Sequence, residues 1–390
     1  MSRQKVLDEM IATGISASKL DGAMPAIDGS AVTGVGDGVT KSASDPVTNT
    51  NPSGGVGTVW LNTTSGEMFC CTDATTDENV WVNIGGGSGD VQPWSFPGTI
   101  AGYTAGGSDI SAYLNVIDKY SFTTDENATD VGDLTTTMQN TAGQSSSTHG
   151  YTSGGYNAVA EGNTTIQKHS FTTDGNSTNV AVLTVGRYNS AGITSETDGY
   201  NSGGRGVSSA LYNIVDKFSF ATDSDATDVG DLTQQRRGVS GTQSSEHGYT
   251  VAGNDGGTGY YNIIDRFSFS SNNNATDVGD AISSIAYAGN QSSTTHGYSS
   301  GGWNHSGGGS NVIEKFQFAA SVTSTDVGDL TTSGGYRAGS TSTTSGYTAG
   351  RYVPGSFSGL IEKFSLSSDG NAANIGSLST SRYGGSGTQI

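Results

Sequence analysis

Cysteine, proline and charged side chains are all scarce in this chain of 390 residues. The 2 Cys, Cys70 and Cys71, are adjacent, and neighbouring residues rarely reach disulfide geometry. We therefore expect free thiols and a protein made in a reducing cytoplasm. Charged residues amount to 14%, which argues against a solvated disordered tail. With 6 Pro and no glycine at every third position, a collagen-like helix is excluded.

Basic residues and long apolar runs are lacking as well. Asp and Glu outnumber Lys and Arg by 36 to 17, and no basic patch is visible, so we expect no nucleic-acid partner. No run of about 18 apolar residues occurs, so we expect no membrane insertion. The first 30 residues also lack the apolar segment of a conventional secretory signal.

Glycine, by contrast, is abundant at 60 residues, and an internal repeat accounts for it. A Gly-Tyr pair recurs with a spacing of 48 or 49 residues, and its tyrosines are Tyr103, Tyr151, Tyr200, Tyr249, Tyr298 and Tyr347. Each copy continues with a double glycine or its remnant and with an apolar run such as NVIDKYSF (115–122). An acidic run such as TDVGDL (129–134) and a small polar stretch such as GVSGTQSS (238–245) complete the unit.

These six units predict an all-β fold, a six-bladed β-propeller. Each unit offers four short runs of strand-forming residues separated by turn formers, and four strands per repeat are typical of a propeller blade. The last unit continues into RYGGSGTQI (382–390), a small-residue strand with no counterpart before Gly102. We expect this C-terminal strand to complete the first blade and close the ring, which removes two free sheet edges.

The small-residue strands should be innermost, because strands that converge on one axis leave room only for small side chains. The aromatic strand further out should pack blade on blade, with core positions at Phe122, Phe171, Phe220, Phe269, Phe318 and Leu366. A basic residue recurs on the same strand, usually after an acid, at Lys119, Lys168, Lys217, Arg266, Lys315 and Lys363. Because it recurs in every unit, we expect it to form pairs between blades; a six-fold anion site is the alternative.

The repeat resembles the kelch family. The resemblance rests on the Gly-Tyr strand, the double glycine, the strand that reads apolar, acid, Lys, aromatic, and an Arg near the blade junction, and it covers residues 101–390. The chain departs from the kelch pattern on the outer strand, where Val or Ile of the TDVGDL run stands in place of Trp. Membership of such a family implies a binding surface rather than one fixed chemistry.

Residues 1–38 contain a segment, 3–13, that predicts a short helix with one apolar face. A helix this short is marginal alone, so it should dock on a partner. The segment that follows, SKLDGAMPAIDGSAVTGVGDG (18–38), resembles the beginnings of bacteriophage fibre and appendage proteins, particularly those of marine phages. This resemblance implies that residues 1–38 anchor the protein to a virion.

A polar linker (39–56) leads to a small β-module at 57–88, and a second linker (89–100) leads to the propeller at 101–390. The module predicts three strands, at 59–62, 67–71 and 80–84, and it resembles short β-units of phage tail-fibre proteins. We expect its tryptophans, Trp60 and Trp81, to form a mini-core; the alternative is a pair of carbohydrate platforms.

No catalytic motif is apparent, so we expect a protein that is not an enzyme. Three histidines share one repeated turn position (His149, His247, His296), which indicates a structural role and no convergent metal shell. Asp-rich turns such as TDENATD (124–130) and TDSDATD (222–228) read as solvated turns, with Ca²⁺ coordination as the alternative. A pair of carboxylates for glycoside hydrolysis stays open among 36 acidic residues.

Two sets of loops break the repeat and should emerge on one face of the propeller. One set follows the double glycine, and the other joins consecutive blades and includes Tyr287 and Tyr383. Both are rich in Tyr, Trp and Arg, which favour recognition, and loops on a rigid scaffold commonly carry function. The candidate ligand-binding residues are Tyr113, Tyr156, Arg187, Tyr188, Arg205, Tyr212, Arg236, Arg237, Tyr260, Trp303, Tyr336, Arg337, Arg351, Tyr352 and Arg382.

Together these features predict a structural protein of a phage virion, a tail fibre or appendage, that recognises a host-surface glycan or protein. Residues 1–90 would contact other virion proteins, and association of the N-terminal helix would give a homotrimer. No cofactor is expected. One alternative is a structural decoration without a receptor; another is a propeller enzyme that degrades glycans.

Overall fold

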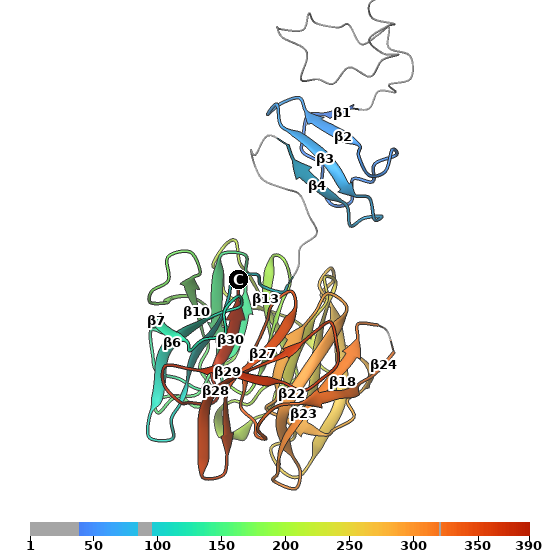
Figure 1. Cartoon of the computed structure of the whole chain (residues 1–390). Helices are drawn as coiled ribbons and strands as arrows, with labels where there is room; N and C mark the ends of the chain where they lie inside the picture. The colour runs from blue at the N-terminus through green and yellow to red at the C-terminus, as the bar shows by residue number, and fades with distance from the viewer. Residues whose placement is uncertain (1–38, 85–95, 320) are drawn as a thin grey trace, which may run out of the picture. The chain divides into compact units, whose positions relative to one another are not determined.

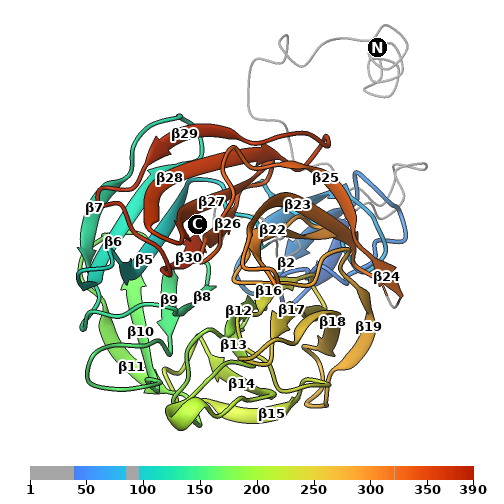
Figure 2. The ribbon, with the colours of Figure 1, turned by 90° about the horizontal axis from the view of Figure 1, so that it is seen from below.

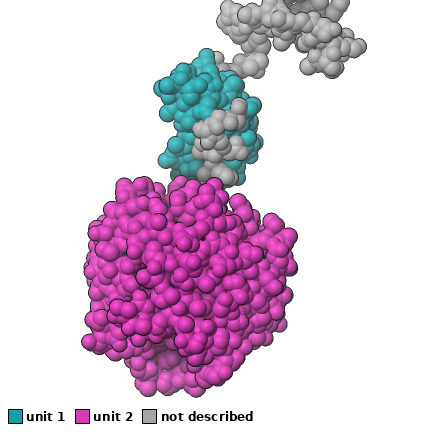
Figure 3. All heavy atoms as spheres, turned by 90° about the vertical axis from the view of Figure 1, so that its left-hand side faces the viewer, with its two compact units in different colours: residues 1–93 teal, residues 94–390 magenta. Residues whose placement is uncertain are grey.

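The computed structural model describes residues 39–84, 96–319 and 321–390. The predicted helix at 3–13 and the rest of the anchoring segment 1–38 lie outside the described residues. The chain divides into two compact units, residues 1–93 and 94–390 (Figure 3). The described residues of both units form strands, with a single short helical turn, η3 (Val207–Ser209), among them (Figure 1). In that part of the chain, no helix is both long and apolar enough to cross a membrane.

In the first unit, the described residues 39–84 form a small sheet of four strands, one more than expected. Its strands, in order, are β1 (Val39–Ser42), β2 (Val59–Asn62), β3 (Met68–Asp73) and β4 (Val80–Asn83). The predicted strands match β2, β3 and β4, but β1 falls in the segment 39–56 that we predicted to be a linker, and it pairs with β2 in parallel. The prediction of a three-stranded module and of a linker over all of 39–56 is therefore wrong.

Aromatic packing forms the core of this small sheet. Trp81 and Phe69 are fully buried, and the rings of Trp60 and Trp81 meet edge to face at 5.8 Å. Cys70 and Cys71 are free thiols on β3, as expected. The mini-core interpretation of the tryptophans is confirmed, since Trp81 offers no exposed face to a sugar.

The second unit contains six sheets. Sheet one consists of β30 (Ser386–Gln389), β5 (Ala101–Ser108), β6 (Tyr113–Ser121) and β7 (Thr129–Asp133). Sheet two consists of β8 (Ala142–Ser145), β9 (His149–Ser153), β10 (Thr165–Ser170) and β11 (Thr178–Val182). Sheet three consists of β12 (Ala191–Thr194), β13 (Asp198–Ser202), β14 (Ile214–Ser219) and β15 (Thr227–Asp231).

The other three sheets repeat this pattern with small additions. Sheet four consists of β16 (Ser240–Gln243), β17 (His247–Asn254), β18 (Tyr260–Ser268), β19 (Thr276–Asp280) and β24 (Val322–Thr323). Sheet five consists of β20 (Ile285–Ala286), β21 (Gly289–Ser292), β22 (His296–Asn304), β23 (Gly309–Gln317) and β25 (Thr325–Asp329). Sheet six consists of β26 (Ala338–Thr341), β27 (Ser345–Val353), β28 (Ser356–Ser365) and β29 (Ala373–Ser377).

The sheets lie around a common axis, which makes the fold all-β and propeller-like (Figure 2). The small-residue strands β8, β12, β16, β26 and β30 lie near the centre of this view, and β7, β11, β15, β19 and β29 lie at the rim. β30 pairs antiparallel with β5, Thr388 opposite Tyr103, so the expected pairing of the C-terminal strand with the first sheet is confirmed.

Glycine is required on the inner strands because their backbones touch. A Cβ on Gly192 would lie 2.1 Å from the carbonyl oxygen of Gly143, and one on Gly387 would lie 1.9 Å from that of Gly339. Sheet five carries Asn290 at the equivalent position, and its side-chain amide donates to the Gly241 carbonyl. At Gly192 and Gly387 a Cβ would clash with the neighbouring backbone, as the expected crowding implied, whereas Asn290 is accommodated through its hydrogen bond to Gly241.

Between sheets, the tyrosine of each Gly-Tyr pair packs on an aromatic or apolar residue of the next sheet. The Tyr103 ring lies 4.9 Å from that of Phe171, and the Tyr347 ring of sheet six lies 4.7 Å from that of Phe122 in sheet one. The predicted core positions need correction, because of the six only Phe171 is fully buried and the others are half-buried. The tyrosines themselves are the better-buried partners, at 0–2% exposure.

Lysine–aspartate pairs also link neighbouring sheets, as expected for the repeated basic residue. The four pairs that join consecutive sheets are Lys119–Asp174, Lys168–Asp223, Lys315–Asp369 and Lys363–Asp125, at 2.5–3.0 Å. In sheet three, Lys217 pairs instead with Asp198 of its own sheet at 3.3 Å. Because these pairs are partly exposed, each contributes little to the free energy of unfolding.

Candidate functional site

The two predicted loop sets lie on one face, which we call the loop face. Backbone hydrogen bonds join them directly: Tyr188 to Arg205 at 2.8 Å, and Arg237 to Asn254 at 2.8–3.0 Å. The loops that follow the double glycines and the loops that enter the inner strands therefore support each other. The expectation that both sets emerge together is confirmed.

A ring of six backbone hydrogen bonds encircles the axis on this face. Each loop that enters an inner strand contributes one residue, and each of these residues donates its N–H to the carbonyl of the one before, over 2.5–3.0 Å. The members of this axial ring are Asn140, Asn189, Gly238, Tyr287, Tyr336 and Gly384. All six have a left-handed backbone, with φ between 57° and 70°. Such a φ is uncommon for a residue as bulky as tyrosine.

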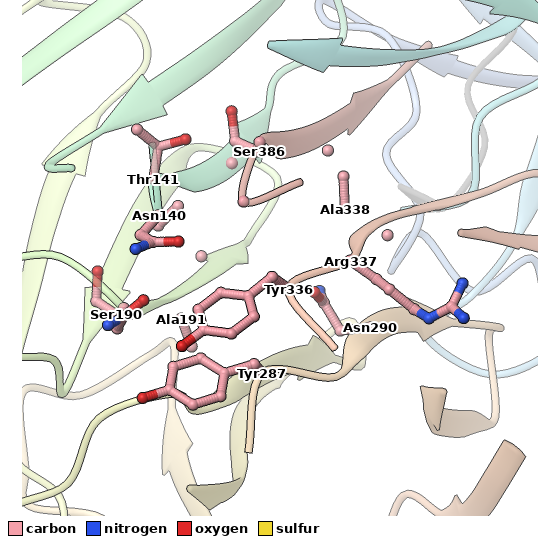
Figure 4. Close-up of a pocket in the computed structure, with 18 of the residues that line it drawn as sticks. Asn140, Thr141, Ser190, Ala191, Tyr287, Asn290, Tyr336, Arg337, Ala338 and Ser386 are labelled. Carbon is pink, nitrogen blue, oxygen red and sulfur yellow. The ribbon is translucent and has the colours of Figure 1, made fainter. Parts of the chain in front are cut away.

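The axial ring borders a cavity of about 80 Å³ on the axis (Figure 4). Inner-strand glycines form much of its wall, together with the polar side chains of Asn140, Thr141 and Ser190. The Asn140 Oδ1, Thr141 Oγ1 and Ser190 Oγ atoms have no hydrogen-bond partner within the protein. Buried polar oxygens of this kind usually hold ordered water.

An aromatic cleft of about 270 Å³ adjoins the axial cavity. Its lining residues come from sheets four, five and six and are Arg237, Asn254, Gly257, Tyr260, Tyr287, Trp303, Tyr336 and Tyr352. Tyr287 and Tyr336 line both spaces, and their rings stack with centroids 4.1 Å apart and an interplanar angle of 14°. In Figure 4 the two rings lie parallel beside the labelled polar residues. Burial raises the pKa of the Tyr336 hydroxyl, which therefore stays protonated as a donor.

Arg237 is the cation of this aromatic cleft, and Asn254 positions it. The guanidinium Nε of Arg237 donates to Asn254 Oδ1 at 3.1 Å, and the two residues also pair through their backbones. Asn254 is 2% exposed, so a buried side chain holds the Arg237 guanidinium in place. Arg237 lines the cleft, and a guanidinium group suits a carboxylate or a pair of hydroxyl oxygens.

Trp303 forms the wall between sheets five and six. A Cβ on Gly335 would lie 2.1 Å from its Cδ1 atom, so the indole packs directly against that backbone. Its ring centroid is 6.1 Å from that of Tyr352. Glycine at 335 is thus what allows a large aromatic side chain to lie at this junction.

Five of the candidate ligand-binding residues come together in the aromatic cleft: Arg237, Tyr260, Trp303, Tyr336 and Tyr352. Three lining residues were missed, namely Tyr287, Asn254 and Gly257. Tyr287 belongs to a predicted loop set but was not selected. Asn254 follows Ala252 and Gly253, which take the place of the double glycine in this repeat, and other repeats have predicted ligand residues such as Tyr156 and Trp303 at its position; that shared position was the available signal.

Four predicted ligand residues are not on the surface at all. Arg187, Arg236, Arg337 and Arg382 are 0–5% exposed, and each forms a buried ion pair with the acid on the third strand of its own sheet. The pairs are Arg187–Asp216 at 2.6 Å, Arg236–Asp265 at 3.1 Å, Arg382–Asp118 at 2.9 Å and Arg337–Glu362. Burial lowers the pKa of each guanidinium and the carboxylate opposes this. Their assignment to the ligand face was wrong, since the buried acid holds them inside the sheet.

The repeat itself contained the signal for these pairs. In sheet two the arginine position is Met138 and the acid position is Gln167, and the Gln167 amide lies 3.4 Å from the Met138 sulfur. Sheet two thus lacks charge at both the arginine position and the acid position. In sheet five Glu314 has no arginine partner among the described residues, and burial raises its pKa.

The other predicted residues lie elsewhere on the loop face. Tyr113, Tyr156 and Tyr188 form a row, with centroids 5.7 Å and 5.2 Å apart, and the Arg205 guanidinium lies 5.9 Å from the Tyr188 ring. Two further residues are isolated from both groups: Tyr212 packs against Gly206, and Arg351 donates to the Ser333 carbonyl.

The described residues contain no group of three His, Cys, Asp or Glu side chains arranged to hold a metal ion. In the Asp-rich turns, Asp125 and Asp223 pair with Lys363 and Lys168. The backbone N–H of Val182 donates to Asp225. These carboxylates are used in contacts between sheets.

Comparison with known proteins finds no matching family model and no matching curated protein. Among solved structures, one titled "Structure of YjhT" is similar, with a TM-score of 0.54 and 14% sequence identity. The match covers 65% of this chain and 88% of that one. At this identity the similarity is one of fold alone.

Proposed function

We propose that this protein is a phage virion component whose six-bladed, kelch-like propeller binds a host-surface glycan at the aromatic cleft. The observation that carries the proposal is the composition of the cleft: four tyrosines, one tryptophan and one arginine held by an asparagine. Aromatic faces stack on sugar rings while their hydroxyls and the guanidinium donate hydrogen bonds. Burial raises the pKa of Tyr260 and of Tyr336, which keeps these hydroxyls as donors at neutral pH.

The proposed propeller is supported by two kinds of contact that link the last sheet back to the first. Six sheets contribute one residue each to the axial ring, and the Tyr347–Phe122 contact packs sheet six on sheet one. A rigid ring of this kind fixes the loops that line the cleft. Loops on a rigid scaffold lose little conformational entropy when a ligand binds.

Binding rather than glycan cleavage is supported by the charges at the site. Glycosidases of the usual kind need two carboxyl groups across the scissile bond. Among the described residues that line the aromatic cleft, none carries a carboxyl group. We therefore propose a protein that binds its glycan and does not hydrolyse it.

The virion part of the proposal rests on the sequence resemblance of residues 18–38 and 57–88 to phage fibre proteins. Residues 1–90 would attach the protein to other virion proteins, and the propeller would face the host. The mass of the purified chain in solution, measured by light scattering, tests whether it is a homotrimer.

A glycan array with the full chain tests the function. We expect binding to a limited set of sugars, with Tyr260→Ala and Arg237→Gln each weakening it by about tenfold, the effect of about 1.4 kcal/mol. A matched control is Glu246→Gln, an exposed position next to β17 at the end opposite Asn254. It should bind as the unaltered chain does.

Three outcomes would contradict the proposal. Binding that is unchanged in both cleft variants excludes this cleft. Absence of binding to any glycan and to host cells favours a structural decoration. Release of reducing ends from host polysaccharide favours the enzyme.

A further inference from the structure

Aromatic rings continue from the aromatic cleft around the loop face. The Tyr352 ring lies 4.8 Å from that of Tyr383, which follows Arg382 in the loop before β30. The Tyr383 carbonyl accepts from the Ser108 amide at 2.9 Å, and Ser108 stands opposite Tyr113 in the β5–β6 pairing. From Tyr113 the rings of Tyr156 and Tyr188 follow.

We call this series the tyrosine arc: Tyr352, Tyr383, Tyr113, Tyr156 and Tyr188. It passes over sheets six, one, two and three, and its consecutive ring contacts are 4.8, 5.7 and 5.2 Å between centroids. Four of the five are half-buried, so each is held by its neighbours and still reaches the surface. The arc thus consists of two aromatic segments, Tyr352–Tyr383 and Tyr113–Tyr156–Tyr188, which the Ser108 backbone links, and together they present a track and not one pocket.

Three arginines on the loop face lack a carboxylate partner within the described part of the chain. Arg205 lies at the Tyr188 ring, Arg237 in the aromatic cleft and Arg351 apart from both. Each is only half-buried, unlike the four arginines inside the sheets. In a chain of net charge −19, positive charges left without a partner on one face indicate an anionic group in the occupant.

The amount of charge in that occupant is limited. A net charge of −19 repels a densely charged polyanion, while three separate guanidinium groups suit isolated carboxylates. Aromatic rings between them suit neutral sugar rings. A chain in which acidic and neutral sugars alternate satisfies both.

We infer that the loop face binds a linear glycan of alternating acidic and neutral sugars, which starts in the aromatic cleft and lies along the tyrosine arc. This rests on the proposed function and adds the length and charge of the ligand. A terminal sugar would use the cleft alone; a linear chain also uses Tyr113 of sheet one and Tyr156 of sheet two.

Calorimetric titration of the full chain with two oligosaccharide series tests the inference. Hyaluronan oligosaccharides alternate a uronate with a neutral sugar, and chitin oligosaccharides of two to eight residues are a neutral match. We expect hyaluronan affinity to rise with length up to about six sugars and to fall with added salt. The chitin series should bind at least about tenfold more weakly.

Variants distant from the cleft give the sharper readout. Tyr156→Ala should lower the affinity of the eight-residue hyaluronan fragment about fivefold, which is about 1 kcal/mol for one stacked ring, and leave that of the disaccharide unchanged. Tyr156→Phe, which keeps the ring, should restore most of the loss. Tyr260→Ala in the cleft should weaken both fragments. Thermal unfolding of each variant checks that the fold is retained.

The inference is overturned by affinity that does not depend on length, by equal binding of the two series, or by binding of neither. Each of these results leaves the proposed function standing if the glycan array still finds a sugar that needs Tyr260. If the glycan array also shows no binding, both the inference and the proposed function are excluded. A host protein that binds the face without its glycans would also overturn the inference.

Discussion

The backbone amide of Asn140 donates a hydrogen bond of 2.5 Å to the carbonyl of Gly384. Asn140 precedes the inner strand of sheet two and Gly384 precedes that of sheet one, so the bond joins loops that are far apart in sequence. It is one of the six bonds of the axial ring, and all depend on the left-handed backbone of the residues that form them.

The left-handed backbone of Asn189, whose φ is 57°, predicts that this position of the axial ring tolerates glycine better than a β-branched residue. Asn189→Val should lower the free energy of unfolding by about 1–2 kcal/mol, because a β-branched side chain is strained in this conformation. Asn189→Gly should cost less than about 0.5 kcal/mol, because glycine adopts it freely. Urea denaturation of both variants measures the difference, and equal losses would show that the backbone conformation is not the cause.

The inner-strand contacts predict a severe effect of one methyl group. Gly192→Ala places a Cβ 2.1 Å from the Gly143 carbonyl oxygen, and we expect a loss of about 3 kcal/mol or more from overpacking. Gly257→Ala is the matched control, since a Cβ there meets only the Asp255 side chain at 3.4 Å or more. Thermal unfolding should separate the two by several degrees. A Gly192→Ala chain as stable as the control would mean that the sheets can move apart.

The buried ion pairs predict that charge must be removed from both partners together. Asp216→Gln leaves Arg187 buried without its carboxylate, which should cost about 3–5 kcal/mol. The double variant Arg187→Met, Asp216→Gln copies the pair Met138–Gln167 of sheet two and should recover most of that loss. Chemical denaturation of the single and double variants measures the recovery. No recovery would argue that sheet three needs the ion pair itself.

Acid sensitivity should arise from His169. It is 3% exposed in the position that other sheets fill with Phe or Tyr, and burial lowers its pKa to about 4, with His149 adding repulsion. The unfolded chain therefore binds more protons between pH 6.5 and 4, and the free energy of unfolding should fall by about 3 kcal/mol as the pH drops through that window. His169→Phe should remove most of this dependence, and the exposed His305→Gln should not. A pH series of denaturation curves decides between them.

The sequence predicted the all-β, propeller-like character, because strand-forming runs and turn formers alternate with one period throughout. It also predicted the pairing of the final strand, since the stretch 382–390 repeats a strand that the first unit lacks. The Lys–Asp contacts between sheets were predicted from the basic residue that recurs in every unit. Six blades and the virion role stay predictions.

Other features depend on tertiary context that local sequence does not contain. The short strand β1 forms only because β2 offers it a parallel partner. Nothing near Arg187 shows whether its side chain points outward or into the sheet; the buried Asp216 decides this. Bulky tyrosines at positive φ, as at Tyr287 and Tyr336, are too rare to be expected, so the axial ring and its stacked pair were not predicted.

The pairing of β30 with β5 has a consequence for the synthesis of the protein. A ribosome completes β30 after every other strand, so sheet one keeps an open edge at β5 while sheets two to six are already available to fold. During this interval the edge can pair with another chain, as open strand edges do. The nascent protein is thus exposed to misassembly until β30 has emerged, and a chain cut before β30 would keep the open edge of sheet one.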